Sequence, residues 1–355
     1  MKKNLLIASL LVTGLLASCS KETGQVPPQG QQELKFSVAT TDVPTRATPV
    51  VGTTFPNGQF KIHGYNKVGA SYTTKVLDGA IATVAGAAVT LDGTYYKPLV
   101  SAGSAIYCIY PSTVSALATD VPDATPTLAI THTVPTTFAT QPDVLYARDV
   151  NGTTFPQNID LVFDHMLTRV TFQCRVINNP SNAVVKISSI TLNDAVSTGT
   201  LTVGLTGDPT WSNNTATDNY TATVGTSKVI GSTYDLKPDT EGDGTEGDNE
   251  KNYTNVFAST DKNNSLLMIP ASITQLNAMN MVVTVNINGT DVTLNPVTGI
   301  GTTTQAEIGS GWLKGKNVNY RMELDVNKVM PSIKITTVRV NDWGDPEHVD
   351  IPLNP

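Results

Sequence analysis

Short runs in which apolar and polar residues alternate follow one another along most of the chain. One run places Leu34, Phe36 and Val38 on the same side, with polar residues between them. Longer runs occupy residues 60–65, 105–110, 170–176 and 281–287, and stretches rich in Gly, Asn, Asp and Pro separate them. A period of two is typical of strands with one buried face. The pattern predicts antiparallel β-sandwiches, with a short helix near residues 273–279 and little other helix.

The runs fall into two strand-rich halves of a 355-residue chain, each long enough to bury its own core. Gly, Thr and Pro between Asn151 and Asn158 predict a break there, which gives domains at 47–158 and 159–355. The chain has 52 Thr and only 15% charged residues. Because β-branched side chains suit a pleated surface, this composition favours an all-β fold.

Residues 1–18 have the pattern of an export signal, with Lys2 and Lys3 ahead of an apolar stretch. The stretch is too short to span a bilayer. It ends in Leu-Ala-Ser followed by Cys19, which resembles a bacterial lipobox. We therefore expect acyl lipid (diacylglycerol) on Cys19, an attachment to the outer membrane by lipid alone, and a flexible tether over residues 24–32. The alternative is an ordinary secretory signal with a coincidental cysteine.

Charge and motif content exclude several classes of function. The net charge is −7 and the pI is near 5.1, so a nucleic-acid partner is not expected. Nucleophile-elbow, zinc-protease and phosphate-loop motifs are missing from the sequence, and His165 lies within an apolar strand pattern that favours a packed structural role. No enzyme and no cofactor are predicted. Cys108 and Cys174 are expected on strands, either as buried free thiols or as a disulfide.

Residues 235–250 form an acidic stretch with few apolar positions. Asp239, Glu241, Asp243 and Glu250 stand at the spacing of a calcium-binding loop. Neither flank has a helical pattern, and a repeated Thr-Glu-Gly-Asp tetrad produces such a match easily. A solvated loop between strands is the favoured interpretation, and a calcium site is the alternative.

Several segments together resemble the fimbrillin family of type V pilins from Bacteroidales. They run in the family's order: the lipobox at Cys19, the early strand, Arg46-Ala47, and residues 142–147, 161–170, 312–320 and 338–343. The resemblance covers most of the chain, although the acidic stretch is not a family feature. It implies two transthyretin-like, Greek-key β-sandwich domains in tandem, in agreement with the two strand-rich halves.

The resemblance also implies a maturation pathway. An Arg-specific protease is expected to cut between Arg46 and Ala47 and to release residues 19–46, including Leu34, Phe36 and Val38. Loss of these side chains would open an apolar groove, which a strand from another subunit fills by β-augmentation. The expected partners are other fimbrial subunits in head-to-tail contact, which gives an extracellular filament.

The C-terminus offers a candidate donor strand over residues 333–355. Apolar residues alternate, with a slip at Thr336-Thr337 typical of a bulge, and a polar turn follows Trp343. The candidate donor side chains are Ile333, Ile335, Val338, Val340, Val349, Ile351 and Leu353. The alternative is that this segment closes its own domain.

Two functions remain open at the level of sequence. The favoured one is a stalk or tip subunit of an adhesive fimbria, because an anchor subunit would keep its lipid and would not need Arg46. The other is a lipid-anchored surface protein that never polymerises and binds a glycan or a host or bacterial surface protein. Trp211, Trp312 and Trp343 are its candidate sugar-stacking residues.

Overall fold

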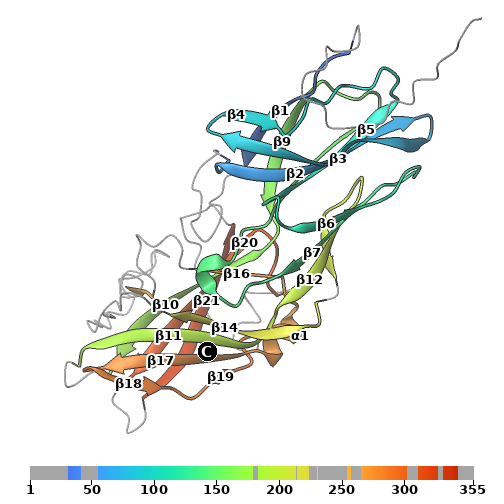
Figure 1. The fold of residues 1–355 in the computed structure, drawn as a ribbon. Coiled ribbons are helices and arrows are strands. Elements are labelled where there is room, and N and C mark those ends of the chain that lie inside the picture. Colours follow the sequence, from blue (N-terminus) through green and yellow to red (C-terminus); the bar gives the residue numbers. More distant parts are fainter. Residues whose placement is uncertain are drawn as a thin grey trace, which may run out of the picture.

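The computed structural model describes residues 31–40, 55–178, 183–212, 214–223, 230, 254–256, 265–301, 311–326 and 331–342. Within these residues the chain is almost entirely β-structure, as the alternating pattern predicts, and forms four sheets. The molecule is elongated, with β1 to β5 and β9 at one end and β11, β17 and β18 at the other (Figure 1).

The first sheet has the strand order β1-β9-β8-β5-β2-β3-β4. Its strands are β1 (Lys35–Thr40), β2 (Gly58–Val68), β3 (Ser71–Ala85), β4 (Ala88–Leu91), β5 (Gly103–Tyr110), β8 (Leu145–Asn151) and β9 (Asn158–His165). Every residue of β5 is buried, so this central strand is covered on both faces.

A smaller sheet covers one face of the first. Its order is β13-β12-β7-β6, with β6 (Ser115–Ala118), β7 (Leu128–Thr133), β12 (Thr198–Val203) and β13 (Thr210–Ser212). Tyr65 and Tyr107 of the first sheet share a core with Leu128 and Ile130 of β7. The 3-10 helix η1 (Phe138–Thr140) follows β7 in the chain.

The remaining two sheets pack face to face around a continuation of the same core. One contains β10 (Thr168–Ile177), β15 (Thr254–Asn255), β16 (Leu266–Met268), β20 (Lys316–Asp325) and β21 (Ser332–Asp342). The other contains β11 (Val185–Val196), β14 (Thr217–Thr223), β17 (Asn280–Ile287), β18 (Thr290–Thr293) and β19 (Val297–Thr298). Alternate residues of β10 point inward, which is the period-two pattern of its sequence.

The expected helix is present as α1 (Ile273–Ala278). Ser272 caps it: its hydroxyl accepts from the Gln275 backbone N–H, while the Gln275 side chain accepts from the Ser272 backbone N–H at 2.8 Å. This reciprocal pair satisfies two N–H groups that the first helical turn leaves unpaired.

The pairing differs from the sequence-based expectation in two ways. Most strand pairs are antiparallel, but β1 pairs with β9 in parallel, and β10 pairs with β20 in parallel. The expected break at residues 158/159 falls inside β9, which pairs with β8 in the first sheet. A loop-like composition marks an exposed connection, but it does not determine which sheet the following strand joins.

Candidate strand-exchange groove

The short N-terminal strand β1 lies at the edge of the first sheet, and backbone hydrogen bonds hold both the strand and the residues just before it. On one side it pairs with β9 over its whole length, from Lys35 opposite Asn158 to Thr40 opposite Phe163. On the other side the Leu34 N–H donates to the Tyr95 carbonyl at 2.9 Å, just before β1 begins. β1 and the residues just before it therefore occupy a slot with β9 as one wall, and residues 95–97 form the other wall at the start of the slot.

The inner face of β1 contacts an apolar core that is separate from the large core of the rest of the molecule. Leu34 is 4% exposed, and Phe36 and Val38 are partly buried against this core. Its floor is formed by side chains of β2, β3, β5 and β9, including Phe60, Ile62, Leu77, Ile106, Cys108 and Phe163. Fully buried, large apolar side chains contribute about 1.5–3 kcal/mol each. Because Phe36 and Val38 are only about half-buried, the three side chains together hold β1 by about 3–6 kcal/mol.

Aromatic rings fill one end of the floor. Phe55 lies with its ring centroid 4.6 Å from that of Phe163, 5.3 Å from Tyr110 and 5.8 Å from Phe60. The edge-to-face geometry of the last two pairs is one that aromatic rings favour. Phe55 stands alone between Thr and Pro residues in the sequence, so alternation gave no signal for its role.

The outer face of β1 is polar and exposed. Lys35 and Ser37 point outward, and the Ser37 hydroxyl donates to the Asp160 carboxylate on β9. We name the slot between β9 and residues 95–97, together with its apolar floor, the β1 groove. A strand that binds in this groove needs apolar residues at alternate positions and a backbone free to pair with β9. It needs no particular side chain at any one position.

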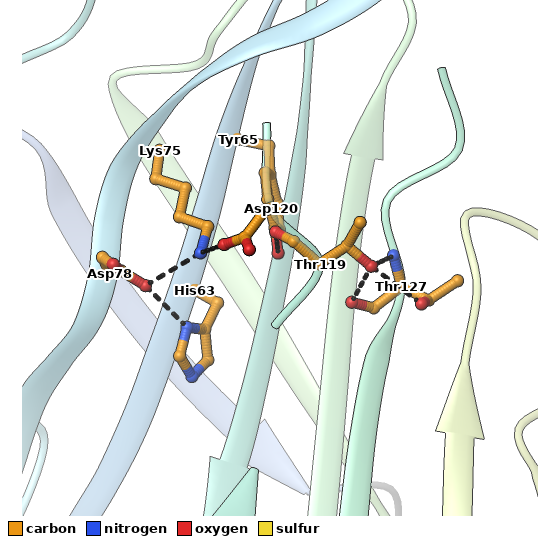
Figure 2. Close-up of polar contacts among 7 residues, drawn as sticks. All are labelled: His63, Tyr65, Lys75, Asp78, Thr119, Asp120 and Thr127. Carbon is orange, nitrogen blue, oxygen red and sulfur yellow. Dashed lines mark hydrogen bonds and ion pairs between the residues drawn. The ribbon is translucent and has the colours of Figure 1, made fainter. Parts of the chain in front are cut away.

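The opposite face of the same sheet is tied down by polar contacts (Figure 2). The Tyr65 hydroxyl donates to the Thr119 carbonyl at 2.9 Å. Lys75 lies 3.2 Å from Asp120 and 3.7 Å from Asp78. The contacts to Thr119 and Asp120 join β2 and β3 to the β6–β7 connection, whereas the Lys75–Asp78 contact lies within β3. The floor of the groove therefore has a fixed backing while β1 covers its open side.

The proposed donor residues have mixed positions. Ile335 and Val338 of β21 are 7% and 2% exposed and belong to the large core, not to the core under β1. Ile333 and Val340 are partly buried against this large core. β21 pairs with β20, with Thr336 as the extra residue of a bulge, where the sequence predicted the slip. In this single chain the strand closes its own sheet. Val349, Ile351 and Leu353 lie outside the described residues.

A charged contact also fastens β21 to its own domain. The Lys334 ammonium lies 2.8 Å from the Glu323 carboxylate on β20, and Arg175 on β10 donates to the same group. Burial alone would raise the pKa of Glu323, but hydrogen bonds from Lys334 and Arg175 outweigh it and lower the pKa below its usual value.

Several of the remaining predicted site residues lie outside the described ranges, and the two predicted strand cysteines lie inside them. Cys19, Arg46, Ala47 and the acidic residues Asp239, Glu241, Asp243 and Glu250 lie outside the described residues. Cys108 and Cys174 are buried free thiols, one in each core. Across the described ranges, no group of His, Cys, Asp and Glu side chains is arranged to hold a metal ion. No helix of those ranges has the length and apolar character to cross a membrane.

Trp211 and Trp312 line one open cleft of about 630 Å³. The Trp312 indole is 1% exposed and donates to the Tyr320 hydroxyl at 3.0 Å, so it belongs to the core. Trp211 is half-buried, and its N–H donates to the Met166 carbonyl at 2.8 Å. Of this pair, only Trp211 has ring surface to offer a ligand, and Trp343 lies outside the described residues.

His165 sits in a buried polar pair. Its Nδ1 lies 2.8 Å from the Asp143 carboxylate, and both side chains are almost fully buried. This packing is the structural role that its apolar sequence context predicts.

The chain is similar to known proteins in sequence and in fold. A profile of a family described as fimbrillin-like matches residues 45–343. A fimbrial protein from Bacteroides vulgatus ATCC 8482 aligns with a TM-score of 0.53 and 12% identity over 88% of this chain and 99% of its own. A fimbrilin from Porphyromonas gingivalis W83 gives 0.42 and 12%, over 88% and 98%. The first likeness shows a shared fold. Among curated proteins, none matches significantly in sequence.

Proposed function

Because the chain belongs to the fimbrillin-like family, we propose that it is a stalk or tip subunit of an adhesive surface fimbria. It is exported as a lipoprotein on Cys19 and polymerises by donor-strand exchange once a protease cuts after Arg46. The observation that carries the proposal is the seating of β1, a short strand that pairs with β9 and covers the apolar floor of the groove. The site binds a strand and catalyses no reaction.

The position of β1 relative to Arg46 supports the mechanism. Thr40 ends β1, and Arg46 follows six residues later, so a cut there separates the strand from the rest of the first sheet. The backbone edge of β9 and about 3–6 kcal/mol of apolar burial are then available to another strand. β-Augmentation by an alternating segment satisfies both.

The donor in this proposal is the C-terminal segment. Residues 333–340 already complete their own sheet, and their donation requires β21 to leave β20. Val349, Ile351 and Leu353 alternate beyond that strand and need no such exchange. We therefore propose that these three residues, rather than those of β21, insert into the groove of the next subunit.

The test uses the purified chain from residue 20 onward, treated with an Arg-specific protease and followed by mass spectrometry and electron microscopy. We expect release of residues 20–46 and then ladders or filaments. Arg46→Ala should stay monomeric, and a chain that ends at Asp342 should be cut but should not assemble. An uncut, lipidated monomer as the only cellular form would instead favour the non-polymerising surface protein.

A further inference from the structure

A group of exposed apolar side chains lies at one end of the β1 groove. Val68, Leu99 and Val100 are 41%, 74% and 69% exposed. We name these three residues the entrance patch. Large apolar side chains this exposed cost free energy unless a partner covers them.

Backbone contacts place the entrance patch where β1 enters the sheet. The Lys97 N–H donates to the Gln32 carbonyl at 2.8 Å, two residues before Leu99. The Asn66 side-chain amide donates to the Val100 carbonyl at 3.0 Å, which holds this loop against the end of β2. Asn66 and Val68 share one face of β2 because side chains alternate along a strand. The three residues therefore lie beside the start of the groove.

The direction of β1 distinguishes the two ends of the groove. β1 runs parallel to β9, so its first residues lie at the end where β9 begins. β9 ends at His165, and β10 starts at Thr168 in the pair of sheets that contain β10 and β11, which we call the second body. The exit end thus adjoins the chain's own second body, while the entrance end lies a full strand away from it.

We infer that the entrance patch is a docking surface for the subunit that donates the strand, with a second copy of this chain as the occupant. The inference rests on the proposed function. A donated strand that takes the direction of β1 has its preceding residues at the entrance end. The folded body of the donor precedes its C-terminal segment, so that body lies against Val68, Leu99 and Val100.

Charge supports this occupant. Lys67 adjoins Val68, and Lys97 stands two residues before Leu99, so the entrance patch carries two cationic neighbours. The C-terminal segment that would pass them contains Asp345, Glu347 and Asp350. Opposite charges at this point orient the incoming segment and raise its rate of association.

The test separates docking from groove binding. The double variant Leu99→Gln, Val100→Gln, which adds no charge beside the acidic peptide, is compared with Leu117→Gln, which changes an equally exposed apolar residue on β6, in the sheet that covers the other face. After protease treatment, binding of a labelled peptide of residues 343–355 reports on the groove, and light scattering reports on assembly. We expect the double variant to bind the peptide within about twofold of the parent and to assemble at least about tenfold more slowly. Leu117→Gln should match the parent in both.

Equal assembly rates for the double variant and the parent would overturn the docking surface while leaving strand exchange in place. Loss of peptide binding in the double variant would mean that the residues act on the groove itself, against the inference. A lower unfolding temperature of the uncut chain, with assembly unchanged, would assign the patch to residues 20–30 of the same chain. A parent that neither binds the peptide nor assembles would refute strand exchange, and the docking surface with it.

Discussion

His132 shows how a single buried group sets a property of the whole fold. Its side chain on β7 is almost fully buried, and burial lowers its pKa to about 4, although the nearby Asp143 carboxylate acts in the opposite direction. His63 is affected in the same sense, since burial lowers its pKa despite the attraction of Asp78. Both imidazoles are therefore held neutral in the folded chain.

The sign of the pH dependence follows from this. The folded-state pKa of His132 lies below the unfolded value of about 6.5, so the unfolded chain binds protons more readily. Above pH 6.5 the free energy of unfolding does not depend on the protonation of His132. It decreases as the pH falls from 6.5 towards 4, because the unfolded chain then gains a proton that the folded chain does not bind. We expect the free energy of unfolding to drop by about 3 kcal/mol over that interval from His132 alone.

Urea unfolding at pH 7 and at pH 4.5 measures the effect. His132→Gln removes the titrating group and should show a clearly shallower dependence on pH than the parent, with the remainder due to His63 and the carboxylates. Parallel pH profiles for the variant and the parent would show that His132 is not held neutral by burial.

At the scale of the strand, β1 divides its residues between an apolar face, which packs in the groove, and a polar face, which is exposed. We expect Phe36→Ala to lower the free energy of unfolding of the uncut first sheet by about 1–2 kcal/mol, because Phe36 is half-buried rather than fully buried. Lys35→Ala, on the exposed face, is the matched control and should change stability by less than about 0.5 kcal/mol.

Thermal unfolding of the two variants, side by side with the parent, gives the comparison. Equal losses for Phe36→Ala and Lys35→Ala would show that β1 is held by its backbone pairing alone, and that the apolar floor contributes nothing.

The alternating pattern was informative about strands and faces. It predicted β1, the inward side of β10 and the bulge at Thr336, because each depends on local sequence. Short helices carry a local signal too, and the Ser272–Gln275 capping box marks the start of α1. These features require no knowledge of distant partners.

Strand partners carry no comparable signal. The parallel pairing of β1 with β9 joins Phe36 to Ile159, over a hundred residues away, and alternation cannot identify such a neighbour. The same limit hides the sheet that β7 shares with β12, which links the two halves of the sequence. The role of Leu99 and Val100 was missed because it depends on where their loop lies relative to β1.

At the scale of the whole molecule, the two ends of the elongated fold have different roles in this account (Figure 1). The groove and its entrance patch lie on the first sheet, while the proposed donor segment follows β21 of the second body. A contact between unlike surfaces of two copies does not close on itself, so repetition gives a filament. In the proposed mechanism, the contacts of Tyr65 and Lys75 behind the groove would keep its shape when β1 leaves.

The central claim is that β1 must leave its groove before subunits can assemble. Ser37 and Asp160 are opposite one another on β1 and β9, and their side chains touch. Replacing both with cysteine, in a chain starting after Cys19, places two thiols where a disulfide can lock β1 in place. After Arg-specific cleavage, electron microscopy should show monomers while the disulfide is intact and filaments once a reductant opens it. Filaments from the locked, fully oxidised chain would contradict the account.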